Sequence, residues 1–496
     1  MKNVIRIAAA ILSLSGLGLL CSCGESGTEP VPAALSEPSV TAGIEEVSAE
    51  TEELSEYQRL LAKVPQKDLG GGVFRFLNFT DCTWANTIMS AEEENGEVLN
   101  DAVWQRNDAV ASALNVTLEE EIIPSGNICQ TMRRLIQAGD DAYDVFWGFT
   151  QDCASLISNS LLYDAKELKN LDLAAPWYNQ KLNEQLNFGD KYFMLFGDAH
   201  IGYYQAIYMF GFNKTLLGNY DLEDPYTLYE NGKWTWDKMY EMASAVQRDL
   251  NGDGVYNILD DCYGLGIAAD MGVSFLHSAG FSITGKDQDN YPVYDGIGEK
   301  LVSAYQKACQ YLYCSKDFVA VSYLYCNSND DWDHAFQEDR CLFVMDAIGA
   351  FADHRASDVV YGMLSVPKYD ENQTEYITPM YYNSMAMYIP ITNDDLDTTG
   401  IVLENLYAQS HETVRNAFID SIVYHKFARD ESSIAMIDTC IDHASVDIAY
   451  VFNWGAVHTK ISDLFKKGSM DLMSAVQKVE PKLTTDLDKT MEAYHG

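Results

Sequence analysis

Residues 211–264 read GFNKTLLGNYDLEDPYTLYENGKWTWDKMYEMASAVQRDLNGDGVYNILDDCYG, and this stretch decides how the rest of the chain is interpreted. Towards its end, oxygen-bearing side chains alternate along the sequence, and Gly254 follows the third of them. Calcium takes six to eight oxygen ligands, and a twelve-residue loop gathers them when a glycine at its sixth position allows a sharp turn. The pattern predicts a calcium loop whose ligands are Asp249, Asn251, Asp253, the carbonyl of Val255, Asn257 and Asp260, with Asp261 as an alternative last ligand.

An acidic Asn-Gly-Asp-Gly turn that binds no metal is the alternative interpretation of the same residues. The segment before the loop predicts a helix that Thr235 caps, because apolar residues then recur at helical spacing, at Trp236, Met239, Tyr240, Ala243 and Val246. Residues 263–267 are typical of a loop or a strand, so only one helix is expected to flank the loop. A regulatory pair of EF-hands is therefore not expected, and the metal would be a structural staple.

Short motifs in and beyond this stretch resemble, in their order, the extracellular solute-binding proteins of bacterial ABC sugar importers. They are FNK at 212–214, GKWTWD at 232–237, DLNGDG at 249–254, YG at 263–264, FQEDRCLF at 336–343, VPKYDENQTEY at 366–376 and IPITNDD at 389–395. The resemblance implies two α/β lobes that bind a ligand between them without chemistry, and it leaves the ligand open. In the family, one residue usually separates the last acidic ligand from the Tyr-Gly pair. In this chain two residues, Asp261 and Cys262, separate Asp260 from Tyr263, which leaves the twelfth ligand open.

The expected fold class is α/β, with two hinge-linked lobes of the periplasmic-binding-protein kind, each holding a helix-flanked sheet. Residues 73–147 alternate strand and helix patterns, which favours a parallel sheet covered by helices. The resemblance places chain crossings near residues 198–205, 360–367 and 409. The expected organisation is lobe 1 over 70–205, lobe 2 over 206–359, a return to lobe 1 over 360–408, and C-terminal helices of lobe 2 over 409–496.

Residues 1–23 are typical of a bacterial lipoprotein signal peptide. Lys2 and Arg6 precede an apolar run too short to span a bilayer comfortably, and LCSC at 20–23 resembles a lipobox with Cys23 as the acylated residue. An ordinary secretory signal is the alternative. Residues 24–69 are predicted to be an acidic, disordered tether. The protein is therefore expected on the outer face of the cytoplasmic membrane, held there by its lipid.

The chain is strongly acidic, with 33 Lys and Arg against 74 Asp and Glu and a formal net charge of −41. Such a surface repels polyanions, which argues against nucleic acid and against peripheral binding to anionic lipid. Eleven cysteines without a close CxxC pair, two of them in the lipobox, form neither a disulfide framework nor a zinc site.

The sequence contains no GxSxG, HExxH or phosphate-binding GxxxxGK[ST] motif, so a binding site is expected and not a catalytic one. Ligands of open α/β sheets bind beyond the carboxyl ends of the strands, and sugars need flat aromatic rings together with polar side chains for their hydroxyls. The residues selected on this basis are Asp81, Trp84, Trp147, Tyr204, Asp346, Asn383 and Trp454, each with core packing as the alternative. For Tyr203 and Trp332 core packing is favoured.

The leading hypothesis is a lipid-anchored, monomeric receptor that closes two lobes around a carbohydrate and delivers it to the membrane subunits of an ABC permease. A secreted glycoside hydrolase that uses two carboxylates is one alternative. A carbohydrate sensor or adhesin on the same fold, without a permease, is the other.

Overall fold

The computed structural model describes residues 55–495, except 323 and 424–430. The expected signal peptide, the acylated Cys23 and the tether up to residue 54 lie outside the described residues. Leu54–Gly496 form one compact unit by their contacts. Within the described part of the chain, no helix combines the length and the apolar character that a membrane crossing requires.

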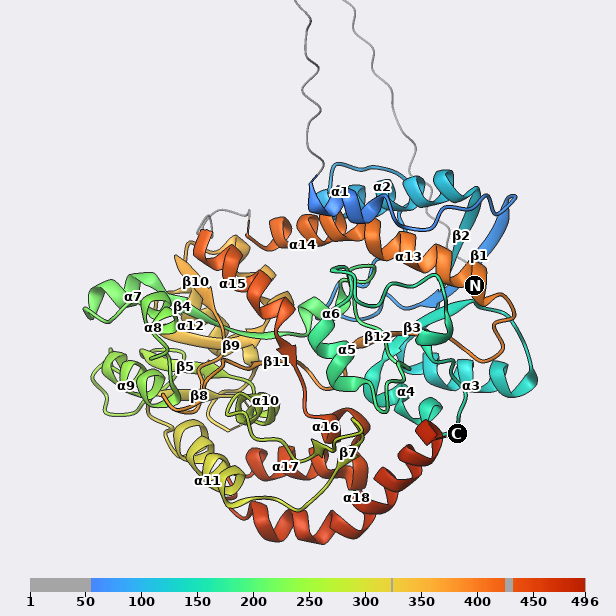
Figure 1. The fold of residues 1–496 in the computed structure, drawn as a ribbon. Helices are drawn as coiled ribbons and strands as arrows, with labels where there is room; N and C mark the ends of the chain where they lie inside the picture. The colour runs from blue at the N-terminus through green and yellow to red at the C-terminus, as the bar shows by residue number, and fades with distance from the viewer. Residues whose placement is uncertain (1–54, 323, 424–430, 496) are drawn as a thin grey trace, which may run out of the picture. The chain divides into compact units, whose positions relative to one another are not determined.

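The first sheet has four strands in the order β12-β3-β1-β2 (Figure 1). β1 pairs in parallel with β2 and β3, whereas β12 runs antiparallel to β3. Parallel neighbours need a crossover connection, and helices α2 and α3 supply one on either side of β2. The elements expected over residues 73–147 are thereby confirmed, with bounds β1 Gly72–Asn78, α2 Val98–Leu114, β2 Val116–Ile122, α3 Ile128–Ala138, β3 Val145–Phe149 and, later in the chain, β12 Met385–Tyr388.

The second sheet has five strands in the order β10-β4-β9-β5-β8 (Figure 1). β4 runs antiparallel to both of its neighbours, and β9, β5 and β8 are parallel to one another. Most of their residues are fully buried, as the uninterrupted apolar stretches of β4 and β9 predict. The bounds are β4 Tyr208–Asn213, β5 Tyr263–Ile267, β8 Val319–Val321, β9 Cys341–Ala347 and β10 Tyr361–Leu364.

Two glycines in β5 allow helices to pack directly against the strand. A Cβ atom on Gly264 would lie 2.2 Å from the carbonyl oxygen of Ala243 in α9 (Trp236–Val246), and one on Gly266 would lie 2.8 Å from Cβ of Trp332 in α12 (Asn329–Gln337). The Thr235 side chain caps α9, as expected, by accepting a hydrogen bond from the amide of residue 238. The stretch 211–264 therefore builds β4, α9 and β5 as one packed unit, and Trp332 is a core residue.

The chain passes from the first sheet to the second through α6 (Gly202–Gln205), close to the expected crossing. The return differs from the expected start at residue 360. Strand β10 pairs with β4, with Tyr361 opposite Asn213 and Leu364 opposite Phe210, so it belongs to the second sheet. The return to the first sheet therefore lies between the end of β10 and the start of β12, after residue 364.

The C-terminal helices pack on elements around both sheets, whereas they were expected to belong to the second lobe alone. Helices α13 (Leu396–Glu412) and α14 (Val414–Val423) pack on α2, α15 (Glu431–Asp442) packs on β10, and α16 (Ile448–Phe452) packs on α4 (Thr150–Ile157). The last two helices, α17 (Val457–Lys466) and α18 (Leu472–His495), pack on each other, and α17 also packs on α10 (Gly272–His277). The remaining α-helices between α4 and α12 have the bounds α5 Gln180–Leu186, α7 Lys214–Asn219, α8 Pro225–Glu230 and α11 Glu299–Ala308, and the π-helix η4 and the 3-10 helix η5 span Cys309–Tyr313 and Ile348–Ala356. The short strands are β6 Gly285–Lys286, β7 Pro292–Val293, β11 Thr378–Pro379 and β13 Ala444–Ser445.

The folded part begins before the expected end of the tether at residue 69. Helix α1 (Glu56–Leu61) starts with a capping box in which the Ser55 side chain accepts from the Gln58 amide. The Tyr57 hydroxyl donates to the carbonyl oxygen of Ala408 (2.8 Å), and Val64 is buried against the first sheet's core. The sequence pattern missed this because the helix is short and has no fully buried residue of its own.

Candidate functional site

A row of aromatic side chains lies where the first sheet's strands end. Trp84 follows β1, Phe149 ends β3, and Tyr381 precedes β12. The ring centroids of Trp84 and Phe149 are 6.3 Å apart with nearly parallel planes, and those of Trp84 and Tyr381 are 5.7 Å apart and perpendicular. All three side chains are only partly buried, so solvent reaches them. These are the flat, accessible apolar surfaces that a sugar face requires.

The row continues into the C-terminal helices. Tyr382 packs against Tyr381 with the ring planes tilted by 58° and the centroids 4.7 Å apart. His458 lies 3.5 Å from Tyr382, and Tyr450 lies 5.3 Å from His458, again between ring centroids. Burial, and to a lesser degree Lys466, lower the pKa of His458 to about 3. The imidazole is therefore neutral around neutral pH and contributes hydrogen-bonding capacity without charge.

Polar side chains from both sheets surround these rings. Asp152 follows β3 in α4, Asp270 follows β5, and Asp346 lies near the end of β9. Burial raises the pKa of Tyr208, at the start of β4, and the carboxylates of Asp270 and Asp346 and the phenols of Tyr381 and Tyr382 raise it further. Groups of the two sheets thus lie within electrostatic reach of one another. We call this set the inter-sheet cluster: Trp84, Phe149, Asp152, Tyr208, Asp270, Asp346, Tyr381, Tyr382, Asn383, Tyr450 and His458.

Backbone hydrogen bonds fix the segment that carries Tyr382 and Asn383. The Thr150 hydroxyl donates to the Tyr382 carbonyl oxygen (2.6 Å), and the Thr150 amide donates to the carbonyl oxygen of Ser384 (2.7 Å). The Asn383 Oδ1 atom accepts from the amide of Gln151 (2.9 Å). Because these bonds tie the segment to the first turn of α4, the rings are held before any ligand arrives.

The structure brings three of the sequence-predicted residues, Trp84, Asp346 and Asn383, into the inter-sheet cluster. Asp81 is exposed, and its Oδ1 atom accepts from the amide of Ser125 (2.9 Å) at the edge of the first sheet. No contact joins Asp81 to the cluster within the residues that the structure describes.

Three predicted ring positions are core residues, which corrects the expectation that they face a ligand. Trp147 is 1% exposed and stacks on His200, because β3 runs on to Phe149 and Trp147 points into the helix-covered core. Tyr204 is fully buried, and its hydroxyl donates to Asp198. Trp454 is 2% exposed, and its Nε1 atom donates to the Thr490 hydroxyl (2.9 Å). Tyr203 is also buried, in agreement with core packing.

Sequence reasoning missed most of the inter-sheet cluster. The pair Tyr381-Tyr382 was available as a signal, since two adjacent aromatics precede a strand of the first sheet. Tyr208, Asp152 and Asp270 carried none, because Tyr208 begins the buried strand β4 and the two acids are exposed residues beside buried ones, with no distinguishing neighbour. Only the pairing of strands far apart in sequence shows that these positions meet.

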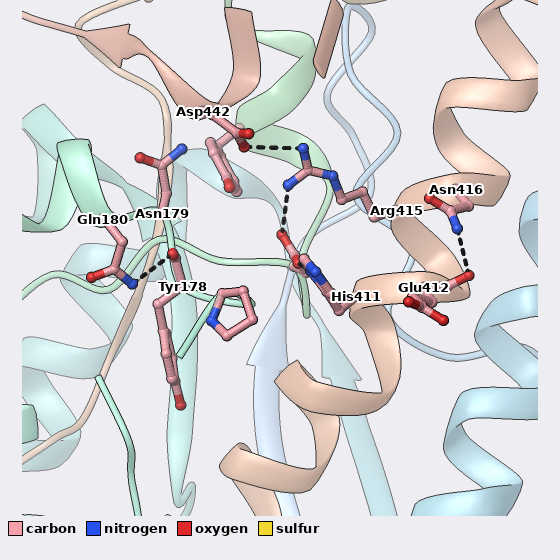
Figure 2. A pocket seen from close by; sticks show the side chains of 11 residues that line it. Tyr178, Asn179, Gln180, His411, Glu412, Arg415, Asn416 and Asp442 are labelled. Carbon is pink, nitrogen blue, oxygen red and sulfur yellow. Dashed lines mark hydrogen bonds and ion pairs between the residues drawn. The ribbon is translucent and has the colours of Figure 1, made fainter. Parts of the chain in front are cut away.

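A separate cavity of about 600 Å³ lies beside the crossing segment at Asp198 (Figure 2). Arg415 of α14 holds it together, with its Nη2 atom 3.0 Å from the Asp442 carboxylate and 3.1 Å from that of Asp438. His411 Nδ1 lies 2.5 Å from Asp198 Oδ2. The carboxylates around Arg415 raise its pKa although burial opposes this. Since its charged groups satisfy one another across α13, α14 and α15, we interpret this cavity as a structural junction.

The predicted calcium loop is closed by its own hydrogen bonds. The Asp249 carboxylate accepts from the amides of Gly252 (2.6 Å) and Gly254 (2.8 Å), and Asp253 Oδ1 accepts from the Val255 amide (2.7 Å). Gly254 adopts a left-handed φ of 78°, as the sharp turn requires. The donors have calcium's preferred chemistry, but no three acidic, His or Cys side chains gather tightly enough to hold a metal in the described residues. Calcium binding at this loop stays a prediction.

Asp261 is the acid on which the loop depends. It is fully buried, and its two oxygens accept from the amides of Leu250 and Asn257, both at 2.8 Å. Asp261→Ala should lower the free energy of unfolding by about 2 kcal/mol, because two partly buried amide hydrogen bonds lose their charged acceptor. Urea denaturation measures this, with the exposed neighbour Asp260→Ala as control, for which less than about 0.5 kcal/mol is expected.

A melting curve with and without calcium tests the metal in the same samples. A melting temperature that rises with calcium in the wild type supports binding, because an ion that binds only the folded chain stabilises it. A melting temperature that calcium and chelator both leave unchanged contradicts it.

Two helix-covered α/β sheets, linked by crossing segments and facing each other across aromatic and acidic side chains, define a two-lobed binding protein. The chain belongs to the bacterial extracellular solute-binding protein family, whose model matches residues 105–410. Comparison with curated protein sequences gives no match.

Solved structures of the same fold include three with bound sugars. An ABC substrate-binding protein from Listeria monocytogenes in complex with cycloalternan is 12% identical, has a TM-score of 0.51 and covers 86% of this chain and 99% of that chain. An extracellular solute-binding protein from Staphylococcus aureus in complex with maltose is 12% identical, with a TM-score of 0.55 and coverage of 85% and 99%. A maltose/maltodextrin-binding domain from Bdellovibrio bacteriovorus bound to maltotriose is 11% identical, with a TM-score of 0.51 and coverage of 84% and 100%.

Proposed function

We propose that this protein captures a carbohydrate in the inter-sheet cluster and delivers it to an ABC importer. The observation that carries the proposal is the row of partly exposed rings, Trp84, Phe149, Tyr381 and Tyr382, at the strand ends of the first sheet, opposite acids of the second. The family is one of solute-binding proteins, and several of its structural neighbours hold maltose or related sugars.

The chemistry of the cluster suits a sugar. The C–H faces of a pyranose pack on aromatic rings, and its hydroxyls need acceptors and donors at the rim. Asp152, Asp270 and Asn383 supply such groups beside the rings. A ligand that contacts groups from both sheets favours the arrangement in which the sheets are close, so binding and lobe closure are the same equilibrium.

Ring removal tests the binding site. Trp84→Ala and Tyr382→Ala should each weaken saccharide binding about 30-fold in calorimetry, because a lost stacking ring costs about 2 kcal/mol. Tyr256→Ala is the control, since Tyr256 is 37% exposed in the loop after β4 and α9 and lies outside the cluster. Unchanged affinity in both ring variants would reject the site.

Export and anchoring complete the proposal. The expected lipobox would place the protein, as a monomer, on the outer face of the cytoplasmic membrane, where a permease could receive its ligand. Cys23→Ser should release the protein into the medium, whereas retention on the membrane would contradict the anchor. Mass spectrometry of an oligosaccharide after incubation separates a receptor from the hydrolase alternative, because a receptor returns its ligand intact.

A further inference from the structure

We propose that the inter-sheet cluster selects neutral sugars and amino sugars, which carry no acidic group, and that it rejects uronates and other anionic sugars. This inference rests on the proposed function and specifies its substrate class. It follows from the charge around the rings, the hydrogen-bonding groups that are available there, and the position of both between the sheets.

The charge at the cluster is negative from two sides. Asp152 stands on α4 beside the first sheet, and Asp270 stands after β5 of the second, and both are exposed. The pKa of Tyr381 is raised, chiefly by burial, next by Tyr382, and to a smaller extent by Asp270 and Asp152. The contacts agree with this placement: Gln151, next to Asp152, donates to the carbonyl oxygen of Tyr450 (2.9 Å), and the 3-10 turn Ala269–Met271 that holds Asp270 packs on α17, which carries His458. An anionic group bound at the Tyr381 phenol would face the same two charges.

Lys466, at the exposed end of α17, acts on the His458 imidazole of the cluster, but the phenols of the cluster show no such basic partner among the described residues. The groups that act on the pKa of Asp152, Tyr208, Tyr381 and Tyr382 are carboxyls, phenols and the Asn383 amide, with no Lys or Arg. The cation–π contacts found in the described chain all fall on rings outside the cluster. His458 is the remaining base, and burial keeps it neutral. An acidic sugar would thus lack the Arg or Lys partner that a buried carboxylate needs.

Hydroxyls at the cluster are available to a neutral partner. Tyr208 and Tyr450 are each 5% exposed, and neither hydroxyl is among the buried polar atoms that lack a partner in the described part of the chain, so solvent reaches their tips. The Ser384 hydroxyl, next to Asn383, is fully buried and has no hydrogen-bond partner there. Buried polar groups in folded proteins are nearly always paired, so this one hydroxyl leaves a bond to be made beside the rings. Sugar hydroxyls both donate and accept, and so can pair with phenols and carboxylates together.

Calorimetry with three trisaccharides tests the inference: a neutral hexose trimer, the matching amino-sugar trimer and the matching hexuronate trimer, in buffer free of divalent cations. The neutral or amino trimer should bind at least tenfold more tightly than the hexuronate, and the difference should shrink at high salt because like-charge repulsion is screened. A hexuronate that binds as tightly as the neutral trimer overturns the inference and leaves the proposed function intact. Absence of binding by all three contradicts the proposed function itself.

A double variant, Asp152→Asn with Asp270→Asn, tests the cause of the selectivity. The ratio of hexuronate to neutral affinity should rise at least tenfold, whatever happens to the neutral affinity itself. Asp488→Asn, an exposed acid of α18 away from the cluster, is the matched control and should leave the ratio unchanged. An unchanged ratio in the double variant contradicts the assignment of selectivity to these two carboxylates.

Discussion

Replacing Gly349 by leucine is expected to weaken saccharide binding about a hundredfold. Gly349 follows β9 of the second sheet, and a Cβ atom there would lie 2.6 Å from the carbonyl oxygen of Trp84 and 3.0 Å from Cβ of Gln205. The first of these contacts is with backbone, which cannot rotate away. Leucine must therefore push the Trp84 segment away from the second sheet.

The displaced segment is fixed on its other side. Gln205 donates to the Asn86 carbonyl oxygen (2.8 Å) and accepts from the Asn86 amide (2.9 Å), so residues 84–86 are held between Gln205 and Gly349. Overpacking of this kind costs about 3 kcal/mol. If the cost destabilises only the arrangement in which the two sheets are close, it weakens ligand binding about a hundredfold.

Calorimetry and small-angle X-ray scattering measure the two consequences together, namely lost affinity and a larger radius of gyration. Gly218→Leu is the matched control, because Gly218 lies in α7 with open space around the added side chain. Wild-type affinity in Gly349→Leu would show that the contact between Gly349 and Trp84 has no part in binding.

Arg106→Met should lower the free energy of unfolding by about 4 kcal/mol. The Arg106 guanidinium is 1% exposed in α2, and burial lowers its pKa to about 10, where it stays charged at neutral pH. It donates to the carbonyl oxygens of Ala199 (2.9 Å) and Met89 (2.7 Å) and to the Ser410 hydroxyl (3.1 Å). Methionine fills much of the volume and leaves these acceptors without the charged donor.

Besides Asn107 in α2 itself, Arg106 has acceptors in three separate segments: the crossing after the first sheet, the loop after β1, and α13. Urea denaturation of Arg106→Met and of Arg134→Met, an exposed arginine in α3, separates lost hydrogen bonds from lost charge. Equal stability of the two variants would contradict a structural role for the buried guanidinium.

Much of the fold could be predicted from local patterns. The strands and helices over residues 73–147 follow from apolar periodicity, and the cap at Thr235 and the glycine turn at Gly254 follow from residue chemistry. Strand β10 was assigned to the wrong lobe because a short apolar strand carries no mark of the sheet it joins. That choice depends on its antiparallel partner β4, which lies about 150 residues earlier in the chain.

The candidate site was less predictable. Trp84 and Trp147 were both selected because they follow or end a strand, and Trp454 because it lies in a Gly-containing loop, yet only Trp84 is accessible and the other two are buried. A tryptophan side chain suits a buried core as well as a surface that stacks on a sugar. The residue type alone therefore does not tell the two roles apart.

The sequence by itself determined the class of this protein: an acidic α/β chain whose ordered motifs resemble solute-binding proteins. Only the tertiary structure decided which rings stay accessible and which acids meet them. The reason is physical, because local pattern fixes how each segment folds, while the exposure of Trp84, and the position of Asp270 opposite Asp152, depend on which distant segments pack around them.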